Sequence, residues 1–130
     1  MIVDSSALAA ILRGEAEQAA FAQIIARSGG ARLSAARYLE TAIVIDRARD
    51  PVTRRALDPF LAANAITVKP VTPARARIAR DAYRDFGKGS CHPAQLNFGD
   101  GFSYALATEM GEPILFKGED FGHTDLEAAR

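Results

Sequence analysis

Short apolar segments alternate with helical stretches along the chain, and this alternation constrains the fold more than any other feature. The apolar segments are residues 1–4, 32–34, 65–70 and 113–116. Between them, apolar residues recur three or four positions apart, which is the spacing of a helix with one buried face. Short apolar strands separated by helices are typical of a parallel sheet covered by helices on both faces. We therefore expect an α/β fold, a three-layer α/β/α sandwich with a short, mainly parallel sheet.

Glycine, proline and serine residues set the expected ends of the helices. Gly14, the Gly29-Gly30 pair and Pro51 stop helices, and the Thr72-Pro73 pair begins one. The pattern predicts helices over residues 7–12, 15–27, 35–49, 52–63, 72–86 and about 100–110. The helix over 35–49 is expected to have a broad apolar face, and residues 125–127 are expected to form a last edge strand.

The length of 130 residues and a hydrophobic content of 48% predict one domain over residues 1–130 with a substantial core. No apolar run approaches the roughly 20 residues that span a bilayer. The first residues do not resemble a signal peptide, and the single cysteine, Cys91, fits a reducing compartment. We expect a cytoplasmic protein without membrane contact.

The net charge is zero, with 16 basic and 16 acidic residues, but the charges are unevenly spread. Residues 27–88 are rich in arginine, whereas both ends of the chain are acidic. A neutral protein of this kind is not a general binder of polyanions. It can still present a basic surface beside an acidic pocket, or its arginines can simply solvate outer helix faces.

Four acidic residues fall where the predicted strands and helices meet. Asp4 ends the first strand, Asp120 follows the last apolar segment, Asp100 opens a helix, and Glu40 lies early in the helix over 35–49. Active sites of such folds lie at the carboxyl ends of the strands. Carboxylates gathered there would repel one another unless a hard cation such as Mg²⁺ or Mn²⁺ bound them. The alternative interpretation of Glu40 is a salt bridge to Arg37 or to an arginine more distant in the sequence.

Ser6 is a supporting candidate, because its hydroxyl could bind a ligand carboxylate or a water molecule of the site, or could cap the first helix. A zinc site is not expected, since the chain has one adjacent pair, Cys91-His92, and an isolated His123. We interpret the Cys91-His92 pair as part of a structural loop. The common glycine-rich nucleotide-binding motifs are absent.

The motifs around these acids resemble those of the PIN-domain family, and within it the VapC toxins of bacterial toxin–antitoxin pairs. The matching segments are residues 2–8 (IVDSSAL), Ser34 with 38–42 (YLETA), 96–107 (LNFGDGFSYALA) and 113–121 (PILFKGEDF). The likeness extends over nearly the whole chain, and the four motifs occur in the family's order with appropriate gaps.

The resemblance implies a PIN-like sandwich and a metal-dependent endoribonuclease. It implies that Asp4, Glu40 and Asp100 hold Mg²⁺ or Mn²⁺, so that water attacks an RNA phosphodiester and leaves a 5′-phosphate and a 3′-hydroxyl. Many relatives have the fourth acid where this chain has Gly118. The candidates here are therefore Glu119 and Asp120, and we prefer Asp120.

The resemblance also implies partners: a homodimer, and a VapB-type antitoxin that blocks the active-site groove and carries the operator-DNA contacts of a hetero-oligomer. Arginines of the middle segment could hold the RNA backbone outside the pocket. The candidates are Arg32, Arg37, Arg75 and Arg77. Two other functions remain open: a metal-dependent nuclease acting on DNA, and a PIN-like scaffold that binds RNA or protein without cleaving.

Overall fold

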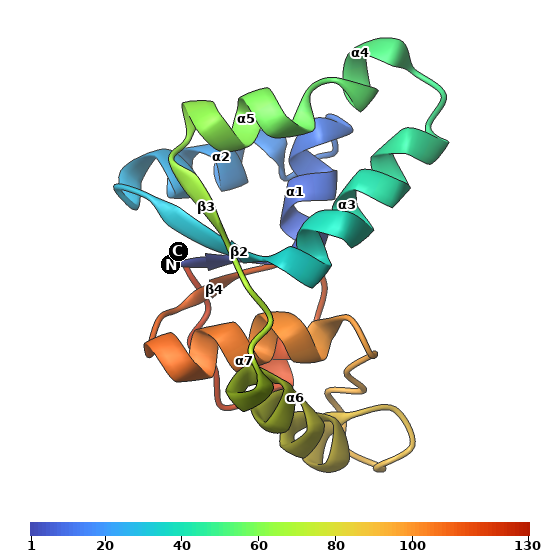
Figure 1. The fold of residues 1–130 in the computed structure, drawn as a ribbon, viewed down its shortest axis with the longest axis vertical. Helices are drawn as coiled ribbons and strands as arrows, with labels where there is room; N and C mark the ends of the chain where they lie inside the picture. Colours follow the sequence, from blue (N-terminus) through green and yellow to red (C-terminus); the bar gives the residue numbers. More distant parts are fainter.

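A computed structural model describes all residues, 1–130. Its centre is a four-stranded sheet with the order β3-β2-β1-β4, and every neighbouring pair is parallel (Figure 1). The strands are β1 (Ile2–Val3), β2 (Ala31–Ser34), β3 (Ile66–Lys69) and β4 (Ile114–Leu115). The prediction of a short parallel sheet is therefore confirmed, because each of the four apolar segments contributes one strand.

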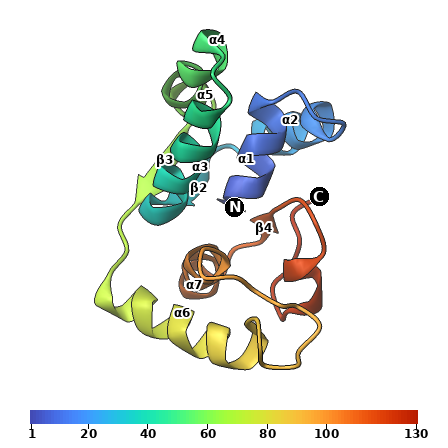
Figure 2. The same ribbon diagram turned by 90° about the vertical axis from the view of Figure 1, so that its right-hand side faces the viewer.

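Helices cover both faces of this sheet, so the molecule has three layers (Figures 1 and 2). One layer contains α1 (Ser5–Leu12), α2 (Gln18–Arg27), α3 (Ala35–Arg47), α4 (Pro51–Arg54) and α5 (Leu57–Ala63). The other contains α6 (Pro73–Phe86) and α7 (Asp100–Met110), with a short 3₁₀ turn, η1 (Asp120–His123), after β4. The three-layer α/β/α sandwich expected from the sequence is confirmed.

Alternate strand residues build two separate cores, one on each face of the sheet. Val3 and Leu115 belong to the core shared with α1, α2, α3 and α5. Ile2 and Ile114 belong to the core shared with α6 and α7. Successive residues of a strand point to opposite faces, so strands of only two residues serve both layers.

The single helix expected over residues 52–63 is wrong, because the structure has two helices there. Asp50 caps α4 by accepting hydrogen bonds from the Val52 and Thr53 backbone N–H groups, and α4 ends at Arg54. Helix α5 begins at Leu57, which places Pro59 in its first turn. A proline has no N–H to donate and is tolerated in a first turn but not inside a longer helix.

Two other expectations need correction. Residues 125–127 form no strand, and only an isolated bridge between Ile114 and Ala128 joins this segment to the sheet. The apolar residues of α3 lie on two faces, because Ile45 is buried while Leu39 and Ile43 are exposed. No helix of the protein has the length and apolar character needed to cross a membrane.

Candidate active site

The four predicted acids line one pocket at the carboxyl edge of the sheet. This pocket of about 260 Å³ is lined by Asp4, Glu40, Asp100 and Asp120, which come from four different parts of the chain. Asp4 follows β1, Glu40 lies in α3, Asp100 is the first residue of α7, and Asp120 begins η1. Glu119 does not line the pocket, and its side chain is 91% exposed. The fold thus brings together residues up to 116 positions apart.

Asp4 is the most completely enclosed of these acids, with 1% of its surface exposed. It caps α1, because its Oδ2 accepts the Ser6 backbone N–H at 2.9 Å, and it also accepts the Ser6 hydroxyl at 2.6 Å. Ser103 of α7 donates its hydroxyl to Oδ1 at 2.6 Å. Asp4, and not Ser6, is therefore the helix cap.

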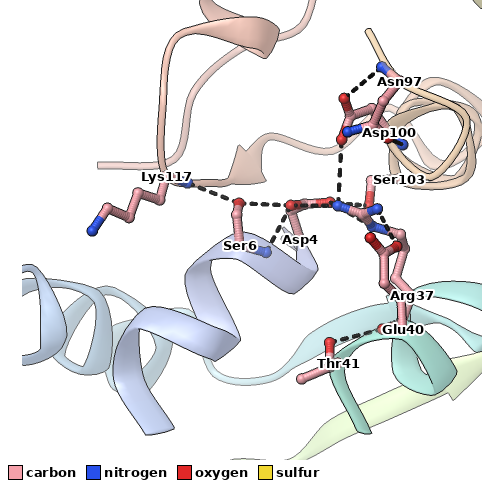
Figure 3. A network of polar contacts seen from close by, with 9 residues as sticks. All are labelled: Asp4, Ser6, Arg37, Glu40, Thr41, Asn97, Asp100, Ser103 and Lys117. Atoms are coloured by element: carbon pink, nitrogen blue, oxygen red, sulfur yellow. Dashed lines mark hydrogen bonds and ion pairs between the residues drawn. The ribbon is translucent and has the colours of Figure 1, made fainter. Parts of the chain in front are cut away.

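Arg37 lies among the acids and contacts three of them (Figure 3). Its Nε and Nη2 donate to the two Asp4 oxygens at 2.9 Å each, its Nη1 pairs with Glu40, and its Nη2 lies 3.3 Å from Asp100 Oδ1. Only 3% of the Arg37 side chain is exposed, against 45% for Glu40. The salt bridge considered for Glu40 is present, and it forms one side of a larger ionic cluster.

Gly99 makes room for this cluster. A β-carbon at this position would overlap both the Arg37 Nη1 and the Glu40 carboxylate. The backbone at Gly99 is ordinary helical, with φ −65°, so the requirement for glycine is one of space.

Asp100 is fixed by a reciprocal cap at the start of α7. The Asn97 N–H donates to Asp100 Oδ2 at 2.8 Å, and the Asp100 N–H donates to Asn97 Oδ1 at 3.0 Å. This pairing, three residues apart, is the geometry of a capping box. It holds one oxygen of Asp100 against the backbone and turns the other toward Arg37.

The pKa values of Asp4 and Asp100 move in opposite directions. Burial raises the pKa of Asp4, but the charge and hydrogen bonds of Arg37, with the Ser103 and Ser6 hydroxyls, outweigh it and hold that pKa below its usual range. Burial raises the pKa of Asp100 to about 6, and the Asn97 backbone bond offsets only part of this effect. The Arg37 guanidinium therefore stabilises the charged form of Asp4 more than that of Asp100.

Ser6 links Asp4 to the segment after β4. Its hydroxyl donates to Asp4 and accepts the Lys117 backbone N–H at 3.0 Å. The Lys117 ammonium is turned away from the acids in Figure 3, and it pairs with Glu15 at 2.6 Å and Glu17 at 3.0 Å. Lys117 is therefore no counter-ion for the pocket.

The arginines proposed to hold RNA lie in different places, and the prediction that Arg37 lies outside the pocket is wrong. Arg32 lies at the opposite edge of the sheet, where it pairs with Glu112. Arg75 pairs with Glu109, and Arg77 is exposed on α6.

The sequence reasoning missed two residues of the site, Asn97 and Ser103, and it did not foresee that Arg37 is buried there. Asn97 could have been found from its spacing to Asp100, since an asparagine three residues before an acid resembles a capping box. Ser103 lies one helical turn after Asp100, on the same face of α7.

The chemistry of the pocket suits a hard divalent cation. Four carboxylates line it, and carboxylate oxygen is the ligand that Mg²⁺ and Mn²⁺ prefer. In the described arrangement, no three carboxylate, imidazole or thiolate groups of the chain come close enough together to hold one ion. The Arg37 guanidinium lies between Asp4, Glu40 and Asp100 instead. The donor set thus fits a divalent cation, and an internal cation takes the central position.

Comparisons with known proteins agree with this architecture. A PIN domain model matches residues 1–127. Ribonuclease VapC28 of Mycobacterium tuberculosis is 57% identical over 129 residues, which cover 99% of this chain and 97% of the relative. Ribonuclease VapC42 of the same species is 46% identical over 129 residues, covering 99% and 98%. The crystal structure of M. tuberculosis VapC20, described as a Sarcin-Ricin loop cleaving toxin, has the same fold, with a TM-score of 0.79 at 20% identity over 99% of this chain and 98% of that one. The chain therefore belongs to the PIN-domain family, within its VapC group.

Proposed function

We propose that the chain is a metal-dependent endoribonuclease, the toxin of a type II toxin–antitoxin pair. The observation that carries this proposal is the meeting of four carboxylates, from four parts of the chain, in one pocket at the carboxyl edge of the sheet. The names of the relatives, Ribonuclease VapC28 and Ribonuclease VapC42, support RNA as the substrate.

Asp4, Glu40, Asp100 and Asp120 would hold Mg²⁺ or Mn²⁺. Such an ion, when bound, lowers the pKa of a water molecule and offsets negative charge on a phosphate. The chain's own contribution is to fix the ligands. Ser6 and Ser103 hold the Asp4 carboxylate by hydrogen bonds of 2.6 Å each.

The substrate is RNA with an accessible loop or single-stranded segment, because a small pocket reaches one phosphate of a splayed strand more easily than one within a duplex. Attack by water, and not by the RNA 2′-hydroxyl, leaves a 5′-phosphate and a 3′-hydroxyl. Of the four arginines predicted to hold the RNA backbone, Arg77 is the one that is exposed on α6 and can contact the RNA.

The partners follow from the VapC group. A VapB-type antitoxin would neutralise the toxin by covering the pocket, and operator DNA would be bound through the antitoxin in the cytoplasm. A second copy of the chain would cover the exposed apolar side chains beside the pocket. These are Leu39 at 59%, Ile43 at 44% and Phe98 at 79% exposed.

Asp4→Asn tests the catalytic proposal. Asparagine keeps an oxygen that can accept the Ser6 N–H, so α1 retains its cap, but the negative charge is lost. We expect cleavage of an RNA hairpin in Mn²⁺ to fall at least about a hundredfold, since the change removes a proposed ligand. The matched control is Asp81→Asn, the same change in an exposed surface ion pair outside the pocket.

The assay is run on RNA and DNA hairpins of the same sequence, with circular dichroism to check that each variant is folded. Cleavage of RNA by the parent and by Asp81→Asn, but not by Asp4→Asn, supports the proposal. Equal cleavage by Asp4→Asn would refute the role of Asp4. Preference for the DNA hairpin would identify a deoxyribonuclease, and binding without cleavage of either hairpin would identify a scaffold.

A further inference from the structure

We propose that Arg37 is a built-in counter-ion that keeps the carboxylate pocket closed to a divalent cation, and that the cation enters only as the guanidinium withdraws from Asp4. This inference rests on the proposed metal-dependent function. It assigns a role to a residue whose own charge is opposite to that of the pocket.

The first argument is the saturation of Asp4. Its two oxygens accept two hydrogen bonds from Ser6, one from Ser103 and two from Arg37. A carboxylate offers about four lone-pair positions, so none is left for a further ligand contact. The serine bonds belong to a helix cap and a buried helix contact. The two bonds from Arg37 are therefore the ones that a cation must replace.

The second argument is that the position of Arg37 is built by its surroundings. The Arg37 side chain is 3% exposed. Its guanidinium contacts three carboxylates that belong to three separate elements, those of Asp4, Glu40 and Asp100. Gly99 leaves the space that its Nη1 occupies. A side chain held this way occupies the centre toward which the acids point, as Figure 3 shows.

The third argument is mutual exclusion. A divalent cation and a guanidinium within a few ångströms of each other in a buried pocket repel strongly, so both do not share the same carboxylates. Glu40 offers an exit, since it is 45% exposed and lies three residues after Arg37 on the same helix face. The guanidinium can withdraw past Glu40 toward solvent, which frees all three carboxylates for the cation.

Calorimetric titration of the full chain with Mn²⁺ tests the proposal. We expect Arg37→Gln to bind Mn²⁺ at least about tenfold more tightly than the parent, since the competing cation is gone. The control is Arg84→Gln, which removes a guanidinium that also pairs with two aspartates, Asp81 and Asp85, but on the surface. Its affinity should equal that of the parent. Equal or weaker binding by Arg37→Gln would overturn the proposal.

A second measurement on the parent protein covers the case in which Arg37→Gln does not fold. In the metal-free chain, the Arg37 Nε–H is bonded to Asp4, so its NMR signal should exchange slowly with water. The signal is assigned by its loss in Arg37→Lys. Saturating Mg²⁺ should speed this exchange at least about tenfold, and unchanged protection would overturn the proposal.

The two proposals fail in different ways. If neither the parent nor Arg37→Gln binds Mn²⁺ or Mg²⁺, the metal site itself is refuted, and the role of Arg37 falls with it. If the parent binds the ion and cleaves RNA, but Arg37 stays protected and its removal leaves the affinity unchanged, only the counter-ion role is refuted.

Discussion

The two edges of the sheet carry ionic clusters with opposite ratios of carboxylates to cations. At the carboxyl edge, Asp4, Glu40 and Asp100 share the one guanidinium of Arg37. At the amino edge, the single carboxylate of Glu112 pairs with two cations. These are Arg32, at 2.7 Å, and the amino group of Met1.

The pKa values follow this balance. Burial opposes the ionisation of Glu112, but the hydrogen bond and charge of the Met1 ammonium, with Arg32, hold its pKa below the usual range. Burial, with the nearby charge of Asp4, instead raises the pKa of Asp100 to about 6, because the Asn97 backbone bond and Arg37 offset only part of the effect. The cluster with enough cations holds the strands together. The cluster with one guanidinium for three carboxylates keeps a net negative charge, which favours a doubly charged ion in place of the guanidinium. Charge balance thus separates a structural cluster from a candidate active site in the same sheet.

The largest expected effect comes from neutralising one acid at each edge of the sheet and comparing the two rates of cleavage. Asp100→Asn should lower the single-turnover rate of RNA cleavage at least about a hundredfold, because it removes a proposed ligand. Glu112→Gln should leave that rate unchanged, since Glu112 lies at the far edge of the sheet. Similar losses in both variants would show that charge balance does not distinguish the two clusters.

A smaller effect tests whether Asp120 or Glu119 belongs to the carboxyl-edge cluster. Asp120→Asn should slow cleavage about tenfold, because Asp120 lines the pocket at its exposed side. Glu119→Gln is the matched control, since Glu119 lies outside the pocket, and its cleavage rate should equal that of the parent. A loss confined to Glu119→Gln would reverse the choice between these neighbours.

The smallest effect concerns stability at the amino edge. Glu112→Gln should lower the free energy of unfolding by about 1 kcal/mol at pH 7, as expected for a partly exposed ion pair. Because the folded pKa of Glu112 is depressed, this stabilisation is present above the unfolded pKa of about 4.3 and is lost as the pH falls through the folded pKa.

Urea denaturation of the parent and of Glu112→Gln at pH 7 and at pH 3 measures this effect. The difference in free energy should shrink at the lower pH. A difference that grows on acidification would contradict the depressed pKa of Glu112.

The strands and their parallel arrangement could be predicted because apolar runs and helical spacing are local properties. Pro59 was also visible in the sequence, but its effect depends on where α5 begins, and α5 begins only after α4 has ended at Arg54. Residues 125–127 were expected to be a strand, yet only one bridge, to Ala128, forms there. Such a boundary depends on tertiary contacts, which local pattern does not specify.

The site could be predicted only in part, for a similar reason. Asp4 lies directly after β1, and the rule that sites lie at the carboxyl ends of strands locates it without coordinates. The nearness of Arg37 to Glu40 was visible in their spacing of three residues. Its contacts with Asp4 and Asp100 depend on how α3 packs beside β1 and α7, which no spacing reveals.

The Ser6 hydroxyl joins Asp4 to the Lys117 backbone, so one oxygen atom ties the two halves of the pocket wall together. The loop that carries Asp120 is thereby anchored to the start of α1 as well as to β4. Loss of this tether in Ser6→Ala would keep every proposed ligand side chain but would release the loop, and Asp120 with it, from the start of α1. Ser6 would in this way help to set the width of the pocket without contacting either the ion or the RNA.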